Sequence, residues 1–140
     1  MTLKDIRDYL EEINSLENLG LDNFYIGRFN TSEDNVVKIR SLNYGSPNDK
    51  LCIGQSRSYD TIACSLLLHI SKDFNKTEEV SNKLYNYFLN NVYLNKELKI
   101  NDNDIHYIRL LSNNVDIGED PNSGIFERVI ELQFYYNKNN

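Results

Sequence analysis

The chain has 140 residues, enough for one domain with its own core, so two independent cores are not expected. Hydrophobic residues make up 40% of the chain and charged residues 26%, a globular balance that argues against a disordered chain and against a fibre. The formal net charge is −6, so the surface as a whole repels phosphate, which disfavours sequence-specific DNA binding.

The first predicted element is an amphipathic helix close to the N-terminus. Thr2 and Asp5 are spaced as in a capping box, and Gly20 is a natural stop for the helix. Apolar residues recur at spacings of three and four residues, as one face of a helix requires: Leu3, Ile6, Leu10, Ile13 and Leu16.

Two strands are predicted after this helix. Residues 23–29 are rich in aromatic side chains, and residues 36–42 are rich in β-branched side chains. The segment between them, 30–35, is polar throughout, so the pattern predicts a hairpin.

The predicted hairpin also carries three basic residues, Arg28, Lys38 and Arg40, near the aromatic Tyr25 and Phe29. Basic and aromatic side chains together are typical of surfaces that bind single-stranded nucleic acid. Because the chain is acidic overall, a solvent-facing side of an amphipathic hairpin is the favoured interpretation.

Residues 43–60 form the longest predicted loop. They include Gly45, Pro47 and Gly54 with several serines and show no sustained periodicity. A connection of this length is unusual in so small a domain, so we expect it to be either functional or disordered.

The second half of the chain predicts a central strand, a helix and two further strands. Residues 62–70 alternate with period two, and residues 77–91 carry the helical stripe Val80, Leu84, Tyr87 and Phe88. Strands are predicted at 105–111 and 125–136, joined by a turn-rich segment.

The order of predicted elements is therefore α-β-β-β-α-β-β, in a single domain that spans residues 1–140. Strands joined mainly by hairpins indicate an α+β fold, with an antiparallel or mixed sheet of about five strands and two helices packed on it.

The residues that usually carry catalysis or bind metals are sparse. Cys52 and Cys64 are too few for a disulfide framework, and two histidines, His69 and His106, offer few ligands for a metal centre. No glycine-rich phosphate loop is present, and Ser56 lacks the second glycine of a nucleophile elbow. We expect no cofactor, no bound metal, no membrane association and no cleaved signal peptide.

Several local phrases of the sequence nevertheless resemble one known family. They are Leu19-Gly20-Leu21, Phe24-Tyr25-Ile26-Gly27-Arg28-Phe29, Tyr44-Gly45-Ser46-Pro47, and Pro121-Asn122-Ser123-Gly124-Ile125-Phe126-Glu127 leading into Leu132-Gln133-Phe134-Tyr135-Tyr136. With the order of elements, these phrases resemble the tail terminator family of long-tailed bacteriophages, which includes proteins called minor capsid or tail completion proteins.

The resemblance implies a structural virion protein and not an enzyme. Such a protein forms a ring, typically of six copies, on the head-proximal end of the tail tube, and it is assembled in the cytoplasm of the bacterial host. The ring ends polymerisation of the tail tube protein and offers a surface to the head-tail connector or neck protein, and to a tail sheath if the tail contracts. Genomic DNA would pass through the ring without specific binding, and an acidic channel would favour this passage by charge repulsion.

The long loop is the candidate contact with the tube. It combines aromatic and basic side chains at Tyr44, Lys50, Arg57 and Tyr59, a content unusual for a loop that only connects two elements. We expect these four residues to contact the last tube ring or a neighbouring subunit.

Three alternatives stay open at this point. A neck adaptor or head completion protein would bind the portal side instead of the tube. A monomeric peptide-binding module would add a strand to an exposed sheet edge. A small hydrolase or transferase would use Ser56 or His69 and needs a pocket that converges on one of them.

Overall fold

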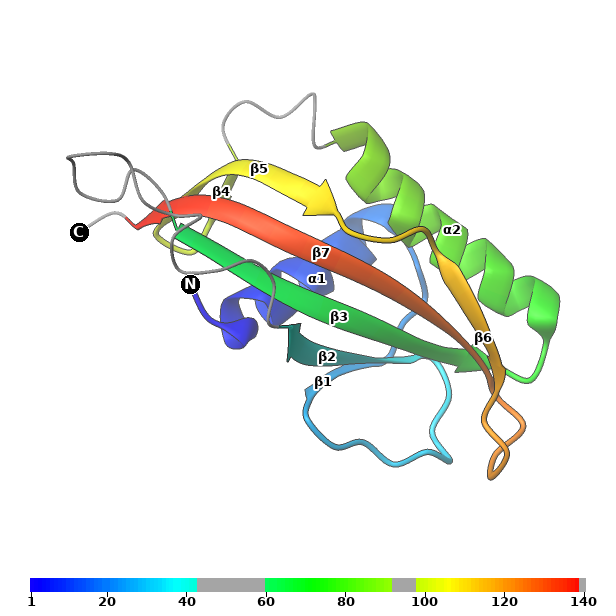
Figure 1. The fold of residues 1–140 in the computed structure, drawn as a ribbon. Helices are drawn as coiled ribbons and strands as arrows, with labels where there is room; N and C mark the ends of the chain where they lie inside the picture. The colour runs from blue at the N-terminus through cyan, green and yellow to red at the C-terminus, as the bar shows by residue number, and fades with distance from the viewer. Residues whose placement is uncertain (43–59, 92–97, 139–140) are drawn as a thin grey trace.

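A computed structural model describes residues 1–42, 60–91 and 98–138 of the chain (Figure 1). These residues form two helices and seven strands. In chain order they are α1 (Leu3–Glu17), β1 (Asn23–Ile26), β2 (Val36–Leu42), β3 (Asp60–Ser71), α2 (Phe74–Asn91), β4 (Leu98–Ile100), β5 (Asn103–Leu110), β6 (Val115–Glu119) and β7 (Phe126–Lys138).

All seven strands belong to one mixed sheet with the order β1-β2-β3-β7-β5-β4, and β6 also pairs with β7. Strands β5 and β6 lie one after the other along the same side of β7, β5 beside its C-terminal half and β6 beside its N-terminal half. Only the β1–β2 pair is parallel among the strand pairs in the described part of the chain. The predicted α+β class is confirmed, with two more strands than expected.

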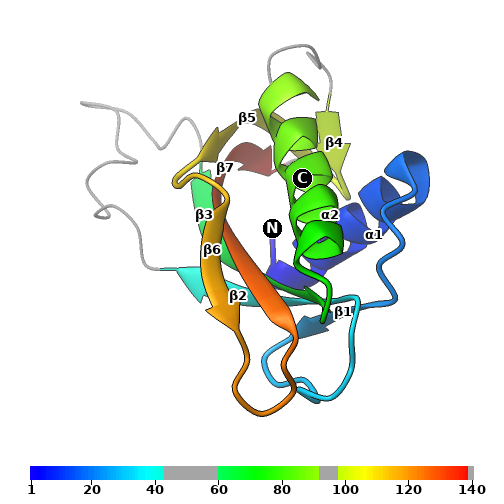
Figure 2. The ribbon, with the colours of Figure 1, turned by 90° about the vertical axis from the view of Figure 1, so that its right-hand side faces the viewer.

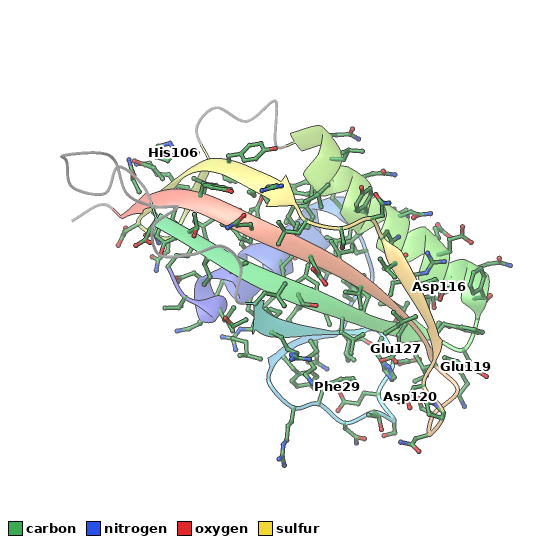
Figure 3. All side chains as sticks on the ribbon, in the orientation of Figure 1. Phe29, His106, Asp116, Glu119, Asp120 and Glu127 are labelled. Atoms are coloured by element: carbon green, nitrogen blue, oxygen red, sulfur yellow. The ribbon has the colours of Figure 1, made fainter. Side chains whose placement is uncertain are left out.

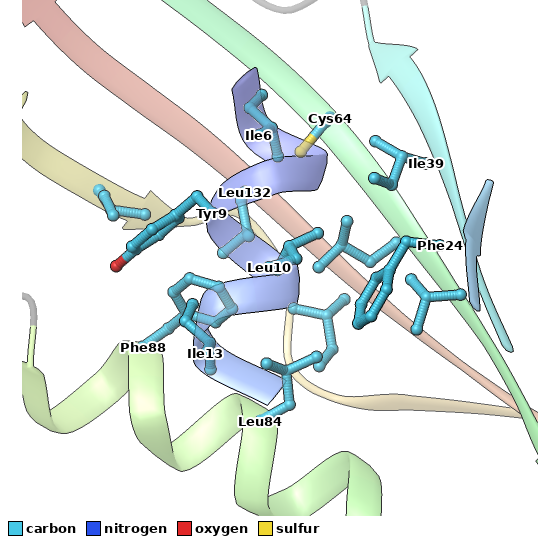
Figure 4. Packing of buried hydrophobic residues seen from close by; sticks show 14 of the residues in the cluster. Ile6, Tyr9, Leu10, Ile13, Phe24, Ile39, Cys64, Leu84, Phe88 and Leu132 are labelled. Carbon is cyan, nitrogen blue, oxygen red and sulfur yellow. The ribbon is translucent and has the colours of Figure 1, made fainter. Parts of the chain in front are cut away.

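Both helices cover the same face of the curled sheet, as the side view shows (Figure 2). Helix α1 packs against β1 and β2, and α2 packs against β3 and β7. The core between these layers contains side chains from both helices and from alternate positions of the strands (Figure 4). Among the largest fully buried side chains are Ile6, Leu10, Leu66, Leu84, Phe88 and Phe134.

The N-terminal helix begins as its sequence predicts. The Thr2 hydroxyl accepts a hydrogen bond from the Asp5 backbone N–H, and the Asp5 carboxylate accepts one from the Thr2 backbone N–H, which completes a capping box. The helix ends at Asn18, which adopts the left-handed conformation with φ of 52°. The stop therefore falls two residues before the predicted Gly20.

The predicted apolar stripe of α1 is correct except at its last position. Leu16 is 67% exposed, whereas Tyr9, which the stripe did not include, is only 8% exposed. Because the chain turns at Asn18, Leu19 and Leu21 enter the core at this end of the helix. Burial and the neighbouring Tyr87 hydroxyl raise the pKa of Tyr9 far above its ordinary value, so Tyr9 is a neutral core residue.

The second helix begins three residues earlier than predicted. The Asp73 carboxylate accepts a hydrogen bond from the Asn75 backbone N–H and so caps the first turn. Thr77, the predicted start, is buried within that turn and donates its hydroxyl to the carbonyl oxygens of Ser71 and Asp73. The predicted core positions Val80, Leu84 and Phe88 are buried.

The predicted hairpin at 23–42 is wrong, because β1 and β2 run parallel. The register pairs Asn23 with Val36, so the two strands start side by side, and the Asp22 N–H donates to the Asn35 carbonyl oxygen at 2.7 Å. Residues 27–35 must therefore return the chain to the beginning of β1 instead of reversing its direction. Gly27, with φ of 92°, opens this return in a conformation that favours glycine.

Two leucines on α1 give a matched test of the packing. Leu10→Ala should lower the free energy of unfolding by about 2–5 kcal/mol because it opens a cavity in the core. Leu16→Ala should change it by about 0.5 kcal/mol or less, since this side chain is mostly in solvent. Urea denaturation followed by circular dichroism measures both values, and equal losses would contradict the observed end of the helix.

Candidate functional site

The face of the sheet opposite the helices is covered by neither helix (Figures 1 and 2). Residues paired across neighbouring strands share a face, so the register identifies its members. We call the helix-free side of β2, β3 and β7 the open face, and its centre consists of Lys38, Arg40, Ser65, Leu67, Val129 and Glu131.

The open face combines an apolar strip with charges at both sides. One row across the sheet runs from Lys38 through Leu67 and Val129 to Val115 on β6. The next row runs from Arg40 through Ser65 to Glu131. The basic side chains therefore lie on β2 and the carboxylate lies on β7, and the apolar side chains between them are partly exposed. Such a mixture is typical of protein interfaces.

Residues 27–35 cross one end of the open face and are anchored there by His69. The His69 side chain is fully buried. Its Nδ1 atom lies 3.0 Å from Glu127 Oε2, and its Nε2 atom lies 2.9 Å from the carbonyl oxygen of Thr31. One imidazole ring on β3 thus joins β7 to the segment that leads into β2.

The His69 ring is held between two oxygen atoms. Glu127 Oε2 lies beside Nδ1, and the Thr31 carbonyl oxygen lies beside Nε2. Because a carbonyl oxygen only accepts hydrogen bonds, Nε2 donates to Thr31. The Glu127 side chain is 16% exposed, and its removal would leave a buried ring nitrogen without its hydrogen-bond partner.

Aromatic contacts complete the anchoring of this segment. The Phe29 ring packs edge-to-face on the His69 ring, with 5.1 Å between ring centroids, and Lys38 Nζ lies 5.9 Å from the Phe29 centroid. The Tyr25 hydroxyl donates to Glu33 Oε2 at 2.7 Å, and this hydrogen bond raises the pKa of Tyr25. The aromatic and basic residues of the predicted hairpin therefore serve partly to fix the crossing segment.

The structure describes only some of the candidate site residues chosen from the sequence. Tyr44, Lys50, Arg57 and Tyr59 lie outside the described residues, as do Ser56 and Cys52. His69 is enclosed by Phe29, Thr31 and Glu127, and burial raises the pKa of the Cys64 thiol to about 12.

Strand β6 is a further feature that the sequence did not predict, although it did predict the turn that follows. The pattern of residues 112–124 predicts turns. Within the turn, Asp120 is only 8% exposed, and its carboxylate accepts hydrogen bonds from the Asn122 N–H and the Ser123 hydroxyl. The chain turns around this carboxylate and returns as β7, which places Asp116, Glu119 and Asp120 near one corner of the sheet (Figure 3).

Comparison with known proteins finds no matching family model and no matching curated protein. Within residues 1–42, 60–91 and 98–138, no helix has the length and apolar character needed to span a membrane. The same ranges hold no group of three or more His, Cys, Asp or Glu side chains placed to bind a metal ion.

The His69–Glu127 pair gives a prediction with a matched control. Glu127→Ala should lower the free energy of unfolding by about 1–3 kcal/mol because it leaves a buried ring nitrogen without its hydrogen-bond partner. Glu127→Gln should cost less than half as much, since its amide can still form a hydrogen bond with Nδ1 while Nε2 donates to Thr31. Urea denaturation of both variants measures the difference, and equal losses would contradict the hydrogen bond between His69 and Glu127.

Proposed function

We propose that this chain is a structural subunit that ends the growth of a bacteriophage tail tube, as a ring on the head-proximal end of the tail. The resemblance to tail terminators supports this proposal. Its phrases fall on described elements at Leu19-Gly20-Leu21 after α1, at Phe24-Tyr25-Ile26 in β1 and at Leu132-Gln133-Phe134 in β7. These phrases border the core or form part of it.

The observation that carries the proposal is the open face of the sheet. A sheet with helices on one side only presents its other side to solvent or to a partner. Here that side offers Leu67 and Val129 between the basic Lys38 and Arg40 and the acidic Glu131. Apolar side chains framed by fixed charges favour a partner protein of matching charge pattern.

A terminator needs two different surfaces. One must fit the last ring of the tube, and the outward surface must differ from that of a tube subunit, so that no further subunit can add. In a ring, each copy contacts its neighbours through unlike surfaces. We assign the open face to contact with the tube and the sheet edges to contact with neighbouring subunits. The sequence-based proposal that Tyr44, Lys50, Arg57 and Tyr59 also contact the tube stands beside this assignment.

Deletion of the gene in the phage that carries it tests the proposal. Electron microscopy of the lysate should show overlong tails of irregular length, because tube growth no longer has a stop. Normal tails beside unjoined heads would instead identify a neck adaptor, the second candidate function. Complete virions of normal length would contradict both assignments.

Complementation of this deletion tests the role of the open face. A plasmid copy with Leu67→Lys should leave the tails overlong, because it puts a charge in the apolar strip of the face. The control Glu11→Lys changes an exposed residue of α1 and should restore tail length. Circular dichroism must show both variants folded, and restoration by a folded Leu67→Lys variant would contradict the assignment of this face to the tube.

A further inference from the structure

We infer that Phe29 is a positioning residue of the open face, because its ring holds the ammonium group of Lys38 in place for a carboxylate of the bound partner. This inference rests on the proposed function, which it deepens by naming the chemistry that one position of the open face recognises. The partner group that fits this position is an aspartate or glutamate side chain of the tube protein.

Phe29 lies on the helix-free side of the sheet. Its ring packs on His69, which is in register with Val36 at the end of the open face. Val36 and Lys38 are two residues apart on β2, so they point to the same side. Neither helix covers this side, yet Val36 is fully buried where the segment 27–35 crosses the sheet (Figure 2). Phe29 therefore continues the apolar strip of the open face next to Lys38.

The Lys38 ammonium group lies against an aromatic ring. Its Nζ atom is 5.9 Å from the centroid of the Phe29 ring, and the face of such a ring attracts a cation. Lys38 takes part in none of the ion pairs of residues 1–42, 60–91 and 98–138. An ammonium group has three N–H donors, so it can bind a carboxylate of a partner while it stays against the ring.

The acidic residues nearest in sequence do not neutralise Lys38. Glu33 accepts the hydrogen bond of the Tyr25 hydroxyl. Asp34 is exposed and belongs to no ion pair in the part of the chain that the structure describes. Arg40 adds a second positive charge two residues along β2. The β2 side of the open face therefore offers two positive charges to an acidic partner.

Buried contacts fix the Phe29 ring itself. The ring packs edge-to-face on the fully buried His69 ring, whose Nδ1 atom is hydrogen-bonded to Glu127 Oε2 on β7. A ring held in this way gives Lys38 a preferred position before the partner arrives. Less side-chain entropy is then lost on binding. Phe29 thus acts on the partner through Lys38.

A double-mutant cycle tests this role. The measurement is co-sedimentation of the purified chain with the overlong tail tubes of the deletion phage. Phe29→Leu removes the aromatic ring and keeps an apolar side chain, and it should weaken binding about two- to fivefold. In a Lys38→Met background the same substitution should cause no further loss, because the charge on which the ring acts is already gone.

Phe29→Tyr is the matched control for the cycle. It keeps the face of the ring and should bind as the native chain does. Circular dichroism must show that the variants fold. Equal weakening by Phe29→Leu in both backgrounds, or equal weakening by Phe29→Tyr and Phe29→Leu, would overturn the inference. Either result would mean that Phe29 acts through the fold and not through Lys38.

Nuclear magnetic resonance tests the contact in the native chain without any partner. The ε-CH₂ protons of Lys38 should resonate upfield of those of the exposed Lys83, because they lie near the Phe29 ring. The difference should disappear in Phe29→Leu and persist in Phe29→Tyr. A native Lys38 signal equal to that of Lys83 would overturn the inference, whether or not the variants fold.

The two proposals can fail separately. Overlong tails in the deletion phage, with equal weakening in both backgrounds, would leave the terminator function standing and overturn the role of Phe29. Normal tails in the deletion phage, with an upfield Lys38 signal in the native chain, would overturn the terminator function and the tube as partner. The contact of Phe29 with Lys38 would then stand.

Discussion

The pairing of β3 with β7 is the contact on which the rest of the molecule depends. It runs from Asp60 beside Tyr136 to Ser71 beside Phe126, and no other pair among the described strands has as many partners in register. The two faces of the β3–β7 pair serve different purposes, because alternate residues along each strand point in opposite directions. One face supplies the floor of the core beneath the helices, and the other supplies the apolar strip of the open face. A slip of one residue would exchange them and expose the core.

The alternation of side chains along β3 explains where the buried His69 side chain lies. At the end of β3, His69 points to the side that the helices do not cover, and the segment 27–35 encloses it there. The same contact holds that segment across β2 and so fixes the parallel course of β1. The sheet is thereby extended by a strand whose outer edge is open. Strand β6, on the far side of β7, leaves a second open edge, on which Asp116 and Glu119 are exposed.

Local patterns in the sequence were sufficient for much of the fold. The spacing of Thr2 and Asp5 predicted the capping box, and the period-two alternation of residues 62–70 predicted the central strand. The parallel course of β1 was not predictable from residues 23–42, because it depends on a contact with His69 far along the chain. Strand β6 was missed because Gly118 and its acidic neighbours suggest a turn. In the structure Gly118 follows a bulge, where its φ of 88° suits glycine. The open face also needed the strand register, whereas the four loop residues chosen from composition lie outside the described residues.

The central proposal is that this chain occupies the end of a protein tube as a ring of its own copies. A cryo-electron microscopy reconstruction of the head-proximal end of the native tail tests this claim most directly. The expected result is a closed ring of this chain on the last tube ring, with the open face toward the tube. A reconstruction in which the chain is absent from that junction would contradict it.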